Sequence, residues 1–259
     1  MSKIIDISHH QGDIDWAKAS KDISLAIIRT QYGTSTIDRK YQQNIEGCKK
    51  YKIPFGVYIY VTFKNATEAL AQAKDFYNRA QGHKPLFYVV DVEEAFGASI
   101  QNIVQGTQTF IDYLKAKGVK IGLYTGHHFY KPYKMDTVKG YDFLWIPRYS
   151  GTSAPGKKPN FSCDLWQYTD KGNVQGIKGN VDLNLVNGSK PLSWFTNNEG
   201  KHEVAQTTEA KVMLNDAKSI PAIIQDGRTY VQVRELADLL GLKIVYNDES
   251  EITKLYEVK

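Results

Sequence analysis

The chain has 259 residues, 42% hydrophobic and 24% charged, which is enough for one sizeable globular domain and a smaller one. Its charge is uneven: residues 1–200 carry 25 Lys and Arg against 18 Asp and Glu, and residues 201–259 carry 8 against 10. A basic front part is attracted to nucleic acid, anionic lipid or the anionic wall of a Gram-positive cell, but no basic run interleaved with aromatics supports nucleic acid, and no stretch approaches the ~18–20 apolar residues of a membrane span.

The N-terminal segment Met1–Asp6 enters a strand at once, without the cationic and apolar segments of a signal peptide. We therefore expect synthesis in the cytoplasm and, for any role on the cell wall, release by another way. Short apolar strands then recur along the chain, with expected bounds Lys3–Ser8, Leu25–Thr30, Phe55–Val61, Leu86–Val92, Lys120–Tyr124, Phe143–Pro147, Asp164–Tyr168 and Val181–Leu183.

Helical patterns separate several of these strands. Asn65 and Glu68 are spaced as a helix start, and a second apolar stripe ends at Gly118. Strands alternating with helices predict a parallel sheet, and about eight of them predict a barrel. Residues 125–180 are rich in Gly, Pro, Lys and Tyr and poor in helical pattern, so we expect an α/β, TIM-like barrel over residues 1–192 with several helices missing or reduced.

A polar segment without periodicity, residues 193–210, reads as a linker. Beyond it, residues 211–259 predict a small α+β module. Strands are expected at Lys211–Leu214, Ser219–Ile224, Thr229–Val233, Lys243–Tyr246 and Ile252–Val258, with a turn at Asp226–Gly227 and a short helix stopped by Gly241.

The apolar run Phe87–Val92 carries two carboxylates spaced two apart, Asp91 and Glu93. Alternate residues of a strand share one face, so the two side chains are expected to project together. Burial of two acids costs free energy unless a function uses them, and glycoside hydrolysis needs carboxyl groups whose pKa values are pushed apart. We therefore place the chemistry at this strand.

Polar residues also follow the other expected strands, as in Asp6–Gly12, Gly56–Tyr60, Gly122–Gly126, Leu144–Tyr149, Trp166–Tyr168 and Asp182–Asn184. With Asp91–Glu93, these segments resemble the family 25 glycoside hydrolases, the N-acetylmuramidase lysozymes of bacteria and phage endolysins. The resemblance covers nearly all of residues 1–190. It implies a flattened, incomplete βα barrel that hydrolyses the β-1,4 bond between N-acetylmuramic acid and N-acetylglucosamine with net retention.

Carried over by position, the resemblance makes Glu93 the general acid, Asp91 its partner, and Asp6 and Asp182 further acids of the groove. Sugar contacts are expected from Tyr60, Tyr124, Trp145 and Gln167. Two roles are possible for Asp91. It attacks the anomeric carbon itself, or it orients the substrate's own 2-acetamido group, which then acts as the nucleophile. The short offset from Glu93 favours the second.

Each of these residues also has a purely structural alternative. Asp6 and Asp182 are each residues that favour turns, and the aromatic residues are compatible with core packing. A carbohydrate-binding protein on an inactive barrel is the alternative function, although retention of all four acids argues against it. A chitinase is disfavoured because its Asp-x-x-Asp-x-Asp-x-Glu pattern needs Asp where this chain has Leu86 and Val89.

Residues 220–246 resemble the small domain shared with the N-terminus of copper amine oxidases and repeated in bacterial envelope proteins. Behind a wall hydrolase this module is expected to bind a wall polymer, and a structural or dimerising role is the alternative. It contains no Cys, and no His after His202, so copper is not expected. In the whole chain, Cys48 and Cys163 read as two buried thiols, with a disulfide left open, and we expect neither metal nor cofactor.

Overall fold

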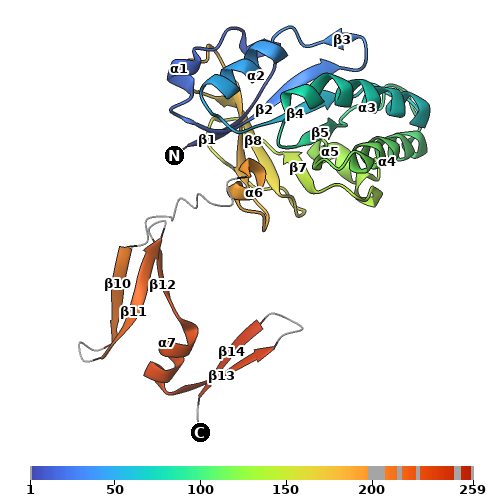
Figure 1. Ribbon diagram of the computed structural model, residues 1–259. Helices are drawn as coiled ribbons and strands as arrows, with labels where there is room; N and C mark the ends of the chain where they lie inside the picture. Colours follow the sequence, from blue (N-terminus) through green and yellow to red (C-terminus); the bar gives the residue numbers. More distant parts are fainter. Residues whose placement is uncertain (1, 198–207, 215–217, 226–227, 248–251, 258–259) are drawn as a thin grey trace. The chain divides into compact units, whose positions relative to one another are not determined.

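A computed structural model describes residues 2–197, 208–214, 218–225, 228–247 and 252–257. The chain divides into two compact units, Met1–Asn197 and Asn198–Lys259. The first unit is a closed barrel with helices on its outside (Figure 1). The expected α/β barrel and the small C-terminal α+β part are both confirmed.

Eight strands form the barrel, in the ring order β1-β9-β8-β7-β6-β5-β4-β2, and pairing of β1 with β2 closes it. All eight expected strands are present. A further strand, β3 (Thr36–Ile37), pairs antiparallel with the end of β2. The eight strands are β1 Lys3–Ile7, β2 Ile23–Tyr32, β4 Phe55–Tyr60, β5 Tyr88–Asp91, β6 Ile121–Tyr124, β7 Phe143–Pro147, β8 Leu165–Gly172 and β9 Val181–Val186.

Strand β9 departs from the expected parallel sheet, because it runs antiparallel to both of its neighbours, β8 and β1. The cause is the short connection over residues 173–180, which has no helix; a parallel crossover needs a dozen or more residues, whereas an antiparallel return does not. The start of β9 therefore lies at the edge where the parallel strands end. This places Asp182 opposite Asp6, its partner in the β1–β9 register.

Three full helices cover the barrel: α2 (Tyr41–Lys50), α3 (Ala66–Ala80) and α4 (Ile100–Ala116). The Asn65 side chain caps α3 by accepting from the Glu68 backbone N–H at 3.0 Å, as the sequence predicts. The other connections hold only short helical segments, which confirms the expected loss of helices. These are α1 Trp16–Ala19, α5 His127–Tyr130 and the 3₁₀ turns η1 His9–Gln11, η2 Gln81–His83 and η3 Met135–Thr137.

Alternation along the strands divides the core into two layers. In β5, Tyr88 and Val90 pack in the layer that the outer helices share, while Val89 and the preceding Phe87 pack inside the barrel. Because Asp91 and Glu93 continue the alternation of Phe87 and Val89, they are directed to the barrel interior rather than to the helices.

A short helix, α6 (Leu192–Thr196), closes the barrel floor. Its Phe195 is fully buried, with its ring edge-on to those of Phe87 and Phe143 at centroid distances of 6.0 and 5.2 Å. The first unit thus extends to Asn197, and the boundary predicted at residue 192 is corrected: the aromatic ring is part of the barrel core. Of the predicted linker, residues 198–207 lie outside the described residues, and β10 begins at Thr208.

We expect Phe195→Ala to lower the free energy of unfolding by about 3–5 kcal/mol, because it leaves a cavity under two large rings. Urea unfolding followed by circular dichroism measures this. Phe195→Leu, which keeps most of the buried volume, is the matched control and should cost clearly less. A loss below about 1 kcal/mol for the alanine variant would show that the helix is not part of the core.

The second unit contains the elements expected for the C-terminal module, in the expected order. Strands β10 (Thr208–Leu214), β11 (Lys218–Gln225) and β12 (Arg228–Val231) form an antiparallel sheet, and α7 (Val233–Leu240) ends at Gly241 with φ 67°. Strands β13 (Leu242–Asn247) and β14 (Ile252–Glu257) pair antiparallel. The predicted turn at Asp226–Gly227 lies outside the described residues.

Cys48 and Cys163 are free, buried thiols, which confirms the first of the two interpretations. Among the described residues, every helix is too short or too polar to cross a membrane.

Candidate active site

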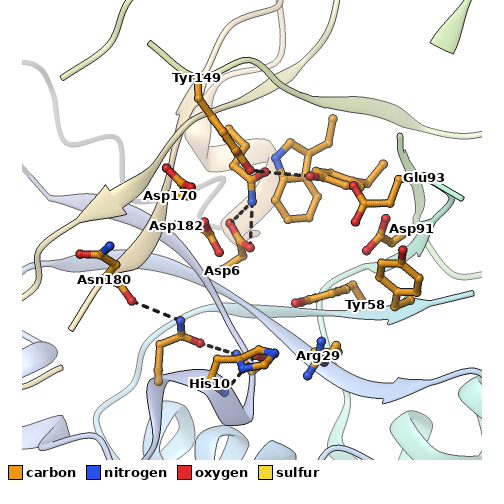
Figure 2. Close-up of a pocket in the computed structure, with 16 residues that line it drawn as sticks. Asp6, His10, Arg29, Tyr58, Asp91, Glu93, Tyr149, Asp170, Asn180 and Asp182 are labelled. Carbon is orange, nitrogen blue, oxygen red and sulfur yellow. Dashed lines mark hydrogen bonds between the residues drawn. The ribbon is translucent and has the colours of Figure 1, made fainter. Parts of the chain in front are cut away.

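A cavity of about 410 Å³ opens at the edge where the parallel barrel strands end (Figure 2). All eight site residues predicted from the sequence line it. The others that line it are Ser8, His10, Gln11, Arg29, Tyr58, Tyr149, Asp170 and Asn180. Figure 2 shows Glu93 and Asp91 together on one side, with Asp170 and Asp182 on the other and Asp6 between them.

The Asp91–Glu93 pair is positioned by the end of β5. Asp91 is the last residue of the strand and is paired in register with Tyr60 of β4 and Tyr124 of β6. Its side chain is buried, at 4% exposure, and Oδ1 has no hydrogen-bond partner among the described residues. Glu93 lies two residues beyond and is partly exposed. A buried acceptor with no partner in the protein is free to accept a hydrogen bond from a bound molecule.

Burial sets the protonation of this pair. It raises the pKa of Asp91 well above its usual range, and the nearby charges of Glu93 and Asp6 add to the shift, while Arg29 opposes it. Burial likewise raises the pKa of Glu93 to about 7, with smaller contributions from the charges of Asp6 and Glu94. Glu93 therefore holds a proton up to near neutral pH and has access to the cavity.

Asp6 is held by two side-chain amides. Gln167 Nε2 donates to Oδ1 and Oδ2 at 3.0 and 2.9 Å, and Asn184 Nδ2 donates to Oδ2 at 2.8 Å. Burial raises the pKa of Asp6 to about 6, and these amides, Asn184 first, limit the rise. The carboxylate is thus fixed in orientation as well as buried.

Three aromatic side chains determine which way those amides face. Tyr124 and Tyr149 donate their hydroxyls to Gln167 Oε1 at 2.8 and 2.6 Å, so the nitrogen of Gln167 must face Asp6. Trp145 Nε1 donates to Asn184 Oδ1 at 2.7 Å. The polar atoms of Tyr124, Trp145 and Gln167 are therefore engaged within the protein. All three predicted sugar contacts line the cavity but are buried, at 6%, 2% and 4% exposure, so each offers a ligand only a small part of its surface.

Asp182 lies across the β1–β9 pair from Asp6 and is partly exposed. Burial raises the pKa of Asp182 to about 8, and the charges of Asp6, Asp170 and Glu93 add to the shift. At neutral pH some of these carboxyl groups are therefore protonated, and the cavity carries fewer negative charges than it has acids.

The raised pKa of Asp182 has a consequence for stability. A carboxyl whose folded-state pKa lies above its unfolded value contributes stability at low pH and loses that contribution as pH rises through the folded value, here between about 4 and 8. We expect Asp182→Asn to raise the free energy of unfolding at pH 9 by on the order of 1 kcal/mol, and less at pH 5. Urea unfolding at both values measures it. Equal effects at the two pH values would show that charge is not the cause.

Sequence reasoning missed several lining residues. Ser8 and Gln11 form a capping box around η1, with Gln11 Oε1 accepting from the Ser8 N–H at 2.9 Å, and this box presents His10 to the cavity. The Ser-x-x-Gln spacing carried this signal. Nothing in the sequence indicated Asp170 and Asn180. They line the cavity because β8 extends to Gly172 and the connection from β8 to β9 returns beside the cavity.

The sequence also did not identify Arg29 as a residue of the site, because it is a single charge within an apolar strand. Its Nε donates to Asp38 Oδ2 at 3.1 Å, and this buried carboxylate also accepts from the backbone N–H groups of His9 and Lys40, both at 2.9 Å. Arg29 is thus a fixed positive charge beside the acids. Among the described residues, no group of three or more His, Cys, Asp and Glu side chains is placed to hold a metal ion.

Comparison with known proteins adds to this geometry. The family model described as glycosyl hydrolases family 25 matches residues 5–177, which include every barrel strand from β2 to β8 and most of β1. The chain belongs to glycoside hydrolase family 25. This family 25 hydrolase is 28% identical over 252 residues to the autolytic lysozyme of Clostridium acetobutylicum, covering 93% of the chain and 74% of the relative.

Two further relatives agree. Lysozyme M1 of Streptomyces globisporus is 28% identical over 200 residues, covering 71% of this chain and 67% of its own. The solved catalytic domain of endolysin ply40, from bacteriophage P40 of Listeria monocytogenes, superposes with a TM-score of 0.70 at 32% identity, covering 76% of this chain and 98% of that domain. The family 25 chain is therefore a glycoside hydrolase of the lysozyme class.

Proposed function

We propose that this family 25 hydrolase cleaves the β-1,4 bond between N-acetylmuramic acid and N-acetylglucosamine in the peptidoglycan of Gram-positive cells, with net retention. The observation that carries the proposal is the Asp91–Glu93 pair, in which a proton-holding carboxyl stands beside a buried carboxyl with an unpartnered oxygen. Glu93 gives its proton to the glycosidic oxygen as the bond to the leaving sugar breaks.

Asp91 orients the substrate rather than attacking it. Its unpartnered Oδ1 is suited to accept a hydrogen bond from the N–H of a 2-acetamido group, whose carbonyl oxygen then attacks the anomeric carbon. The Glu93 carboxylate next removes a proton from water, and that water opens the cyclic intermediate. Two inversions at one carbon give net retention. Asp6 and Asp182 complete the acidic surroundings of the positive charge that develops on the sugar.

Two observations support action on the cell wall: the positive charge of residues 1–200 and the similarity to an autolytic lysozyme. Residues 1–200 carry 25 basic against 18 acidic residues, which favours approach to an anionic wall. The match to the Clostridium autolytic lysozyme covers 93% of the chain and so must reach into the second unit, because the first ends at Asn197. We propose that residues 211–259 bind a wall polymer and hold the barrel near its substrate.

We further propose that the enzyme serves a phage or prophage as an endolysin, made in the cytoplasm and acting on the wall after a membrane lesion releases it. Its 32% identity to an endolysin catalytic domain supports this setting. Expression in a Gram-positive host, with and without a separate pore-forming protein, tests it. Lysis that needs the pore supports release, whereas lysis without it indicates an exported autolysin.

Digestion of purified Gram-positive peptidoglycan tests the activity itself. New reducing N-acetylmuramic acid ends, identified by reduction and mass spectrometry, are expected without new free amines. Proton NMR should show the β-anomer as the first product. New amines would indicate peptide or amide cleavage, an α-anomer would exclude retention, and binding without any release would favour a carbohydrate-binding role.

A further inference from the structure

Three aromatic rings gather beside the cavity on the Glu93 side. Tyr32 and Tyr60 are partners in the β2–β4 register, and their rings stack at a centroid distance of 4.8 Å and an angle of 18°. The ring of Phe96 meets both edge-on, at 6.4 Å from each. Of the three, only Tyr60 lines the cavity. We call Tyr32, Tyr60 and Phe96 the aromatic platform.

The platform is not core. Tyr32 is 38% exposed and Phe96 and Tyr60 are partly exposed, whereas Phe87, Phe143 and the other large rings inside the barrel are buried. Exposed rings that gather beside a site mark contact with a ligand more often than rings scattered singly do. A flat apolar ring offers its face to the C–H face of a pyranose, and the hydroxyls around it stay in water.

Phe96 is held in place by a strained turn. The Ala98 N–H donates to the Ala95 carbonyl at 2.8 Å, and the two central residues, Phe96 and Gly97, have φ values of 50° and 80°. Turns with both central φ values positive favour Asn, Asp or Gly at the first position, and a bulky aromatic residue there costs free energy. The fold does not use this ring in its core, so the strain indicates a function for it.

The order of the strands around the barrel indicates the direction in which a glycan would cross the cavity. In the closed ring, β2 and β4 lie across the barrel from β7 and β8. Tyr149 and Asp170, on the β7 and β8 side, therefore lie opposite the platform, and Glu93 is only three residues before Phe96. A glycan strand that crosses the cavity past Tyr149 and Glu93 continues over the platform.

We propose that the aromatic platform binds the N-acetylated amino sugar on the leaving-group side of the cleaved bond. This inference rests on the proposed function, in which Glu93 protonates the glycosidic oxygen: the sugar beyond that oxygen is then the one nearest the loop that carries Phe96. The sugar that is attacked occupies the acidic interior at Asp91 and Asp6. The platform thus extends the site by one stacked sugar.

The test uses Glu93→Gln as the parent, so that glycans bind without being cleaved. Calorimetry gives the Kd of the peptide-free peptidoglycan disaccharide and tetrasaccharide for the parent and for the parent with Tyr32→Ala or Phe96→Ala. We expect the preference for the tetrasaccharide over the disaccharide to fall roughly tenfold, about 1.4 kcal/mol, in each alanine variant. Tyr32→Phe and Phe96→Tyr keep the rings and should keep the preference.

Controls separate binding from folding. Tyr113→Ala, on the outer helix α4, removes a half-buried tyrosine that does not line the cavity and should leave the preference unchanged. Phe96→Gly, which relieves the strained φ, should lose the preference as Phe96→Ala does but melt at a higher temperature than that variant. An unchanged preference in both alanine variants, or none in the parent, overturns the inference. Failure of the wild type to release N-acetylmuramic acid ends would overturn the proposed function instead.

Discussion

Replacing Glu93 by Gln should reduce kcat on peptidoglycan by at least a hundredfold, within the roughly 10²–10⁴-fold contribution of a positioned general acid. The amide keeps the size of the side chain but has no proton to give at neutral pH. Glu93 is partly exposed and makes no hydrogen bond among the described residues that the fold would lose, so the melting temperature and wall binding should be retained.

Glu94→Gln is the matched control, because Glu94 is the adjacent carboxylate and is exposed outside the cavity. At about pH 5, well below the pKa of Glu93, it should change turnover by no more than about twofold. Turnover by Glu93→Gln above about a tenth of the wild-type rate would remove Glu93 as the acid.

The pH dependence of kcat/KM is a second test of Glu93 as the general acid. A general acid acts only while protonated, so kcat/KM should fall as pH rises through the raised pKa of Glu93, about 7. Loss of the nearby negative charge of Glu94 should move this alkaline limb to lower pH, since a like charge raises the pKa of a carboxyl. Unchanged limbs in Glu94→Gln would assign the alkaline limb to another group.

Asp91→Asn should lower kcat by roughly 10²–10³-fold, while KM changes little. The variant keeps the shape of the side chain, but an amide cannot ionise and so cannot balance the positive charge that develops on the acetamido group as it attacks. The readout that separates orientation from direct attack is the affinity for a thiazoline analogue of the cyclic intermediate. That affinity should fall in Asp91→Asn if Asp91 orients the acetamido group.

Asp112→Asn, at an exposed carboxylate on α4, is the control for aspartate replacement and should not alter kinetics. Trapping a covalent sugar on Asp91 with a 2-fluoro substrate would contradict the orienting role and identify Asp91 as the nucleophile. Full activity of Asp91→Asn would remove Asp91 from the mechanism altogether.

The parts of the fold that follow from local pattern were predictable from the sequence. Runs such as Phe87–Val92 identify a strand because alternation and composition act over a few residues, and the i, i+2 spacing of Asp91 and Glu93 then places both acids on one face. Polar residues at successive strand ends meet because a closed barrel brings those ends to one rim.

The features that were missed depend on contacts between distant segments. The antiparallel direction of β9 is decided by the length of its connection, and the packing of Phe195 beneath Phe87 is a tertiary contact with no local signature. The orientation of Gln167 likewise follows from two tyrosine hydroxyls, one from the end of β6 and one from the loop after β7. Arg29, a lone charge in an apolar strand, is held in place by its contacts with Asp38 and His9, both outside that strand.

The pairing of the first barrel strand with the last also determines when the site comes into existence. Asp6 is synthesised before its partner across the seam, Asp182, and before its amide donor Asn184, which lies 178 residues later in the chain. Because a chain emerges from the ribosome N-terminus first, Asp6 emerges well before the strand that orients it. A chain interrupted anywhere before β9 lacks both Asp182 and the closing edge of the barrel, so we expect the catalytic unit to be inactive until β9 is in place.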